Sequence, residues 1–161
     1  MNFSVLGAGR WGSFIAWYLN KIGNNVTLWG KSSSEKIQQL LETRKNDYVT
    51  IPDSITLSTD LESSIKNSEY IIISISAQGL RGLVKEITKF EGYETKKYIL
   101  CMKGVEKTTG ARLSTILLEC GFPKDNVAIW VGPGHIQSFT AGIPSVMIID
   151  SYNDELSEFL V

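Results

Sequence analysis

Short apolar runs alternate with stretches of helical periodicity along the whole chain. The runs predict strands at residues 2–7, 25–29, 54–58, 70–76, 96–102, 127–132 and 145–150. The runs YIIISIS, KKYILCM and VAIWVG are continuous apolar stretches of the kind seen in strands buried on both faces of a sheet. This alternation predicts an α/β fold of the doubly wound type, a mostly parallel sheet with helices on both faces.

The segments between these runs carry helical signals. Residues 13–22 are predicted to form a helix that ends at Gly23, with an apolar face made of Phe14, Ile15, Tyr18, Leu19 and Ile22. A serine cluster can cap a second helix over residues 34–45, and residues 60–68 have the length of one brief helix.

The last segment, SYNDELSEFLV, opens a further helix in which Leu156, Phe159 and Leu160 have helical spacing, and no end signal follows. No repeat, low-complexity stretch or Pro/Gly/Ser-rich linker divides the sequence. We therefore expect residues 1–161 to form one domain, truncated before an element that continues.

Composition narrows the class of partner. The chain has 161 residues, 43% hydrophobic and 20% charged, with a formal net charge of -1, which offers no attraction for nucleic acid or an anionic membrane. We therefore expect small-molecule partners. No apolar run approaches the ~20 residues of a membrane span and no signal segment is evident, which predicts a cytoplasmic protein. Cys101 and Cys120 lack metal-ligand spacing and are expected to be buried thiols in a reducing compartment, so no metal site is predicted.

The segment VLGAGRWGSF places Gly7, Gly9 and Gly12 as G-x-G-x-x-G between the first strand and the first helix. In a Rossmann-type domain, the first glycine permits the tight turn, the second admits a pyrophosphate to the backbone, and the third lets helix and strand pack closely. The helix N-terminus then offers free N–H groups to the pyrophosphate. The alternative is a glycine-rich turn that serves close packing alone.

The end of the second strand bears on which dinucleotide binds. An NAD-preferring site places Asp or Glu there to accept from the ribose, whereas this sequence reads LWGKSSS, with Gly30 and Lys31 in that place. A lysine and three serine hydroxyls suit a 2'-phosphate, which favours NADP(H) over NAD(H). The alternative is an exposed loop lysine without a ligand.

Three more segments follow predicted strands, at the edge where open α/β sheets bind ligands: SAQGLRGL, CMKGVE and VGPGHIQSF. Lys103, before a glycine, is expected to project into the crevice and hold a substrate hydroxyl or carbonyl near the nicotinamide. Gln78 and Arg81 are predicted either to cover the cofactor or to be solvated helix residues. His135 is either a structural hydrogen-bonding group or, less in keeping with its place beside a glycine turn, an acid or base.

Together, the segments GAGRWG, TLWGK, SAQGLR, CMKGVEKTTG and VGPGHIQSFTAGIP resemble, in order and spacing, the cofactor domain of bacterial-type NAD(P)-dependent glycerol-3-phosphate dehydrogenase. The resemblance spans nearly the whole chain. It implies an oxidoreductase that interconverts dihydroxyacetone phosphate and sn-glycerol 3-phosphate by hydride transfer with NAD(P)H, for glycerophospholipid synthesis.

The resemblance also implies roles for individual positions. Cofactor contacts are implied for Arg10, Trp11, Lys31, Lys103 and Ile136, and substrate contacts for Lys103, Gly132 and Gly134. The sequence departs from the family pattern at four positions. The family commonly has serine where Arg10 and Gly134 stand and glutamates where Gln137 and Ser138 stand, so hydrogen bonding at the substrate edge is expected to differ.

In the family, the main acid/base lysine and the arginine that grips the substrate phosphate lie in a helical C-terminal domain, which residues 1–161 do not reach. The chain is therefore expected to bind cofactor and to turn over little alone, with any homodimer forming through that C-terminal domain. Two alternatives stay open: another two-domain dehydrogenase of the hydroxyacid or ketopantoate type, and a stand-alone dinucleotide-binding module without catalysis.

Overall fold

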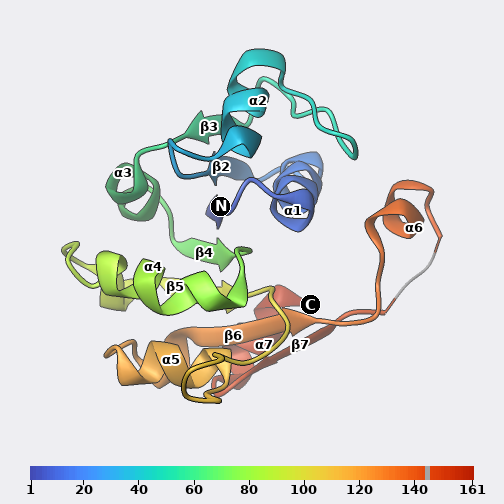
Figure 1. The fold of residues 1–161 in the computed structure, drawn as a ribbon. Helices are drawn as coiled ribbons and strands as arrows, with labels where there is room; N and C mark the ends of the chain where they lie inside the picture. The colour runs from blue at the N-terminus through green and yellow to red at the C-terminus, as the bar shows by residue number, and fades with distance from the viewer. Residues whose placement is uncertain (144–145) are drawn as a thin grey trace.

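The computed structural model describes residues 1–143 and 146–161. These residues form one seven-stranded sheet in the order β3-β2-β1-β4-β5-β6-β7, in which β7 alone is antiparallel to its neighbour (Figure 1). The strands are β1 Asn2–Leu6, β2 Asn25–Trp29, β3 Thr56–Ser58, β4 Tyr70–Ile73, β5 Lys97–Leu100, β6 Val127–Val131 and β7 Ile148–Ser151. All seven predicted strands are confirmed, although Ser145, the first residue of the last predicted run, and Pro144 lie outside the described residues.

Helices cover both faces of this sheet, as predicted. The core on one face joins α1, α2, α6 and α7 to the strands, and the core on the other face joins α3, α4 and α5 to them. The helices are α1 Arg10–Lys21, α2 Glu35–Thr43, α3 Leu61–Lys66, α4 Leu80–Ile87, α5 Leu113–Glu119, α6 Ile136–Thr140 and α7 Asp154–Leu160. Short 3-10 turns are η1 Ala77–Gly79, η2 Tyr93–Thr95 and η3 Lys124–Asn126.

The central strands are buried on both faces because alternate side chains enter different cores. Val5 packs in the α1 core and Leu6 in the α4 core, and Ile72 and Ile73 divide in the same way. The one polar residue inside β1, Ser4, is fully buried and donates from Oγ to a carbonyl of α3 at 2.9 Å. The continuous apolar runs in the sequence therefore follow from burial on two sides.

Helix α1 begins at Arg10, three residues before its predicted start. The helix ends before Gly23, as predicted, and Gly23 has φ +92°. The predicted apolar face is too wide, because Tyr18 is 41% exposed and Ile22 is 56% exposed. Only the narrower stripe that includes Phe14, Ile15 and Leu19 faces the sheet, and Ile22 lies beyond the last helical residue. Both exposed residues are corrections to the sequence-based prediction.

The order in which successive strands are added to the sheet changes side at β1. From β1 it runs through β2 to β3 on one side, whereas β4, β5 and β6 follow on the other side. The parallel ladders continue past the strand ends, with the Ser74 N–H donating to Leu6 O at 2.8 Å and the Cys101 N–H donating to Ile73 O at 3.0 Å. This reversal leaves a crevice at the carboxyl edge of the central strands, which is where open α/β sheets bind ligands.

Candidate functional site

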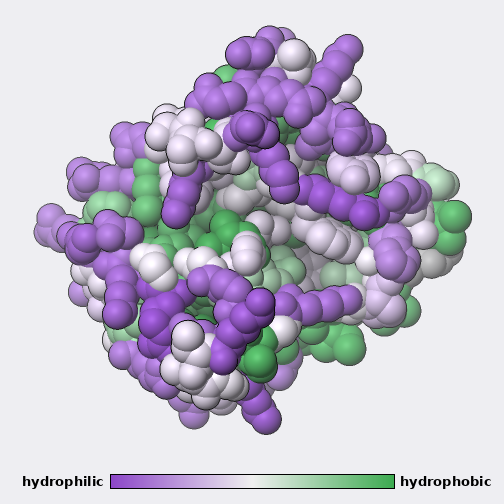
Figure 2. All heavy atoms as spheres, in the orientation of Figure 1, coloured by the Kyte–Doolittle hydropathy of each residue, from purple (hydrophilic) through white to green (hydrophobic). Residues whose placement is uncertain are grey.

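A cavity of about 730 Å³ lies at this carboxyl edge. Its walls come from the turn between β1 and α1, the end of β2, and the segments that follow β4, β5 and β6. Trp29, Leu83, Met102 and Trp130 contribute apolar surface, and hydrophilic side chains surround an apolar recess on the face drawn in Figure 2. A mostly apolar hollow with a few polar groups suits a small-molecule ligand.

The glycine turn forms the base of the cavity. Gly7 has φ +123°, and a Cβ there would lie 2.3 Å from the Ser74 carbonyl oxygen. A Cβ on Gly12 would lie 1.8 Å from the Gly7 carbonyl oxygen, so neither position accepts a side chain. A Cβ on Gly9 would meet only Lys36 Nζ, at 3.8 Å. Packing within the protein therefore explains Gly7 and Gly12, whereas the space above Gly9 opens into the cavity.

The N-terminus of α1 faces the same space. Gly9 is its N-cap residue, no side chain caps the helix, and no acidic residue stands in its first turn. The first N–H groups of an α-helix have no partner within the helix, and its dipole is positive at this end. The arrangement can bind an anion such as a pyrophosphate.

Cationic side chains line the cavity, and none of its described lining residues is acidic. The cations are Arg10, Lys31, Lys36 and Lys103. Lys31 follows β2 at the predicted position and is exposed. Gly30 lines the cavity too, and a Cβ there would lie 2.7 Å from Ile37 Cβ, so its small size also lets β2 approach α2.

Lys36 is a cavity residue that the sequence reasoning missed. It lies in the first turn of α2, and its ammonium reaches to 3.8 Å from the point where a Cβ on Gly9 would lie. The helical pattern of residues 34–45 marks Lys36 only as a polar position, because the direction of α2 relative to the glycine turn depends on the crossover. Trp29 was missed as well, because its place in the apolar run of β2 marks it only as a core residue. Its buried Nε1 is the one buried side-chain nitrogen or oxygen of the described residues without a hydrogen-bond partner.

Lys103 follows β5 and lines the cavity, as predicted. Its side chain is exposed, and no hydrogen bond or ion pair joins it to the described residues. The next residue, Gly104, has φ +110°, a conformation that favours glycine. The chain therefore turns sharply directly after the lysine.

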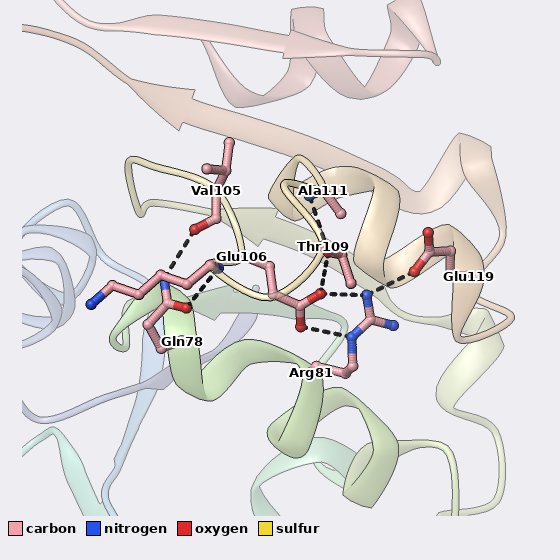
Figure 3. Close-up of polar contacts among 8 residues, drawn as sticks. Gln78, Arg81, Val105, Glu106, Thr109, Ala111 and Glu119 are labelled. Atoms are coloured by element: carbon pink, nitrogen blue, oxygen red, sulfur yellow. Dashed lines mark hydrogen bonds and ion pairs between the residues drawn. The ribbon is translucent and has the colours of Figure 1, made fainter.

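Gln78 and Arg81 lie outside the cavity wall, and the structure gives them a different partner (Figure 3). Both contact the loop of residues 103–112, and Arg81 pairs with Glu106 at 2.7 Å. The Arg81 guanidinium, together with a hydrogen bond from Thr109, lowers the pKa of Glu106 from its ordinary 4.5 to about 2. Arg81 is therefore neither a cavity cover nor a purely solvated helix residue.

The segment after β6 contributes less to the cavity than predicted. Gly132 lines it, whereas Gly134 and Ile136 are not among its lining residues. A Cβ on Gly134 would lie 2.5 Å from the Phe139 ring, and Ile136 is 1% exposed in the α1 core. His135 is exposed and makes no hydrogen bond through its side chain to the described residues.

Arg10 joins the glycine turn to this segment. Its guanidinium donates to Gln137 Oε1 and lies over the Tyr48 ring, 4.8 Å from the centroid. Gln137 lies on α6, so this contact links the start of α1 to the segment after β6.

The two cysteines, Cys101 and Cys120, are free and partly buried. Burial raises the pKa of the Cys101 thiol, which lines the cavity. Within residues 1–143 and 146–161, no group of three or more His, Cys, Asp or Glu side chains is placed to hold a metal ion. No helix formed by these residues is long and apolar enough to cross a membrane.

The chain is similar to known proteins along its whole length. Residues 2–157 match the family described as NAD-dependent glycerol-3-phosphate dehydrogenase N-terminus. A glycerol-3-phosphate dehydrogenase (NAD(P)+) of Thermoanaerobacter sp. (strain X514) is 31% identical over 163 residues, which cover 98% of this chain and 48% of that protein.

Solved structures share the fold. The crystal structure of glycerol-3-phosphate dehydrogenase from Coxiella burnetii aligns with a TM-score of 0.85 at 21% identity, covering 99% of this chain and 49% of that one. The Plasmodium falciparum glycerol-3-phosphate dehydrogenase aligns with a TM-score of 0.81 at 20% identity, covering 99% and 48%. The chain thus spans about half the length of these relatives.

The glycine turn predicts opposite results for two matched substitutions. Gly12→Ala is expected to lower the free energy of unfolding by about 1–3 kcal/mol, because its methyl group would overlap the Gly7 carbonyl. Gly9→Ala is expected to change stability by less than about 0.5 kcal/mol and to weaken dinucleotide binding at least about 10-fold, or ~1.4 kcal/mol. Urea unfolding and fluorescence titration measure the two effects. Tight dinucleotide binding by Gly9→Ala would contradict this use of the space.

The ion pair of Glu106 predicts a pH dependence of stability. Because the folded protein lowers this pKa from 4.5 to about 2, the stabilisation is complete above pH 4.5 and is lost as the pH falls towards 2. The difference in urea midpoint between the parent and Glu106→Gln is therefore expected to be largest near pH 7 and to shrink below pH 4. A difference that stays constant from pH 7 to pH 3 would rule out this ion pair as its source.

Proposed function

Because the chain belongs to the family of NAD-dependent glycerol-3-phosphate dehydrogenase N-terminal domains, we propose that it holds NADP(H) for an enzyme that interconverts dihydroxyacetone phosphate and sn-glycerol 3-phosphate. The observation that carries this proposal is the open space over Gly9 at the uncapped N-terminus of α1. Protein atoms occupy the Cβ positions of Gly7 and Gly12, whereas the position over Gly9 is open and can admit a phosphate group.

The residues present fit a nicotinamide dinucleotide. Gly9 and the first N–H groups of α1 would hold the pyrophosphate, and Arg10 and Trp11, which also line the cavity, would lie near it. The end of β2 would hold the adenosine side. Lys103 and Gly132, on the opposite side of the switch point, would lie at the nicotinamide side.

Lys31, which follows β2, supports NADP(H) as the preferred cofactor. It lines the cavity, and none of the described lining residues offers a carboxylate to a ribose 2'-hydroxyl. Its ammonium would attract a 2'-phosphate, and the 2'-hydroxyl of NAD(H) carries no charge to match it. Lys36, whose ammonium lies over Gly9, would instead face the pyrophosphate that both cofactors share.

The reaction is a reversible reduction of a ketone. When bound, the reduced nicotinamide supplies a hydride to the carbonyl carbon, and the carbonyl oxygen takes up a proton. The Lys103 ammonium would donate a hydrogen bond to that oxygen and stabilise the negative charge that develops on it. The apolar residues of the cavity would exclude water from the reacting atoms.

The chain supplies only part of this machinery. It spans about half the length of its relatives, and the groups that would grip the substrate phosphate are expected in the C-terminal half of the enzyme. Alone it should bind cofactor and turn over little. Two free cysteines are consistent with the cytoplasm, where the product would enter glycerophospholipid synthesis.

Lys31→Ala is expected to narrow the preference for NADPH over NADH. A single charge contact with the 2'-phosphate is sufficient for about a 10-fold preference, or ~1.4 kcal/mol. Titration of each reduced nucleotide, followed by the fluorescence of the tryptophans that line the cavity, measures both dissociation constants. Lys36→Ala should weaken the binding of both nucleotides alike, and the exposed Lys66→Ala, on α3, removes the same charge outside the cavity and serves as the control. Equal affinities of the parent for NADPH and NADH would defeat the proposal.

Lys103→Ala, in the full-length enzyme, is expected to lower turnover of dihydroxyacetone phosphate by about 100-fold or more, since one donor to a developing oxyanion contributes at this level. The dissociation constant of NADPH should change far less. The parent enzyme, assayed with dihydroxyacetone phosphate and each reduced nucleotide, is the direct test of the proposed function. An unchanged rate in Lys103→Ala would remove this lysine from the site.

A further inference from the structure

The loop between β5 and α5, residues 103–112, begins with Lys103 and is closed on itself by backbone hydrogen bonds. The Glu106 N–H donates to Ala111 O at 3.0 Å, and the Gly110 N–H donates to Glu106 O at 2.8 Å. Val105 and Arg112 form an antiparallel bridge at its base. These contacts make the loop a compact unit, and they do not by themselves fix its place against the rest of the domain.

Gln78, in the 3-10 turn after β4, attaches the loop from outside (Figure 3). Its Nε2 donates to Val105 O at 3.0 Å, and its Oε1 accepts from the Lys107 N–H at 2.9 Å. One amide side chain thereby binds the backbone on both sides of Glu106. Gln78 is itself exposed, so its removal leaves no hole in the core.

Arg81, on α4, holds the loop at Glu106. Its guanidinium reaches both carboxylate oxygens, with Nε to Oε1 at 2.7 Å and an Nη to Oε2 at 2.8 Å. Glu106 is 8% exposed and is the one buried charged side chain among the described residues. A buried carboxylate is tolerated where it is paired and hydrogen-bonded, and a paired fork fixes orientation as well as charge.

The same arginine has a second partner that does not belong to the loop. It donates to Glu119 Oε2 of α5 at 2.8 Å, and the Glu119 side chain is 49% exposed. Arg81 thus has a loop arm, to Glu106, and a helix arm, to Glu119. The two arms can be cut separately.

We propose that Gln78 and Arg81 are positioning residues for Lys103, which they act on by fixing the loop of residues 103–112 against α4. This rests on the proposed function, in which Lys103 contacts the substrate. The Lys103 ammonium has no partner among the described residues, so its placement depends on its backbone. Only Gly104 separates Lys103 from Val105, whose carbonyl is bound by Gln78. Because glycine is conformationally free, the Lys103 backbone keeps its place only while Val105 is held.

The test compares three variants of the full-length enzyme. Gln78→Ala and Glu106→Gln each loosen the loop, and Glu119→Gln cuts only the helix arm of Arg81. The loop variants are expected to lower kcat for dihydroxyacetone phosphate about 10-fold or more and to change the dissociation constant of NADPH less than about 3-fold, or ~0.65 kcal/mol. Glu119→Gln should match the parent in both. A further control is Lys89→Ala, which breaks the exposed ion pair between Lys89 and Glu86 at the end of α4.

A double-variant cycle separates positioning from a general structural effect. If Gln78 acts through Lys103, then Gln78→Ala should lower kcat in the parent and should have no further effect in a Lys103→Ala background. A purely structural role would lower both backgrounds alike. Additive effects, or an unchanged kcat in Gln78→Ala, overturn the proposal even if the parent enzyme is active.

Hydrogen exchange gives a readout that needs neither cofactor nor turnover. With no ligand bound, amides in a peptide covering residues 101–112 should exchange at least about 10-fold faster in Gln78→Ala and Glu106→Gln than in the parent or in Glu119→Gln. Unchanged exchange shows that these side chains do not hold the loop and overturns the proposal. Absence of turnover in the parent, by contrast, overturns the proposed function, and exchange alone then decides whether the loop is anchored.

Discussion

The close approach of backbone to backbone at the glycine turn is the constraint on which the rest of the site depends. The carbonyl oxygen of Gly7 lies where a Cβ on Gly12 would be, and Gly7 in turn lies against the chain that leaves β4. These contacts bring the N-terminus of α1 to the point where the sheet reverses direction. A helix end with unpaired N–H groups thereby faces a crevice, and the space over Gly9 stays free of protein atoms other than the end of one lysine.

The charged side chains around the cavity have the same sign as the N-terminal end of the α1 dipole, which is positive. Four cations line the cavity, and its described lining residues include no acid, so the charged side chains and the dipole of α1 attract the same kind of ligand. The one buried acid among the described residues, Glu106, stands three residues after Lys103 and is paired with Arg81, and neither lines the cavity. The Lys103 ammonium is consequently left without a competing partner, which is what a role at a substrate oxygen requires.

Much of the fold is predictable from the sequence because its strands are buried on both faces, and such burial leaves continuous apolar runs. The central strands were found in this way, whereas β3 and β7 are partly exposed and were predicted from apolar runs without such burial. The limits of the elements were less accurate. Helix α1 starts at Arg10 because an N-cap glycine, rather than a polar side chain, begins it, and Tyr18 is exposed because the sheet covers only a narrow stripe of the helix.

The sequence by itself determined the order of strands and helices, the glycine spacing, and the lysines that follow β2 and β5, Lys31 and Lys103. Each of these features depends on neighbours along the chain. Only the tertiary structure decided which side chains meet. It brought Lys36 to the glycine turn, gave Gln78 and Arg81 to the loop after Lys103, and placed Ile136 in the core away from the cavity. The physical reason is that such contacts join residues distant along the chain. Crossover direction, strand register and the tilt of each helix set them, and local periodicity carries no information about any of these.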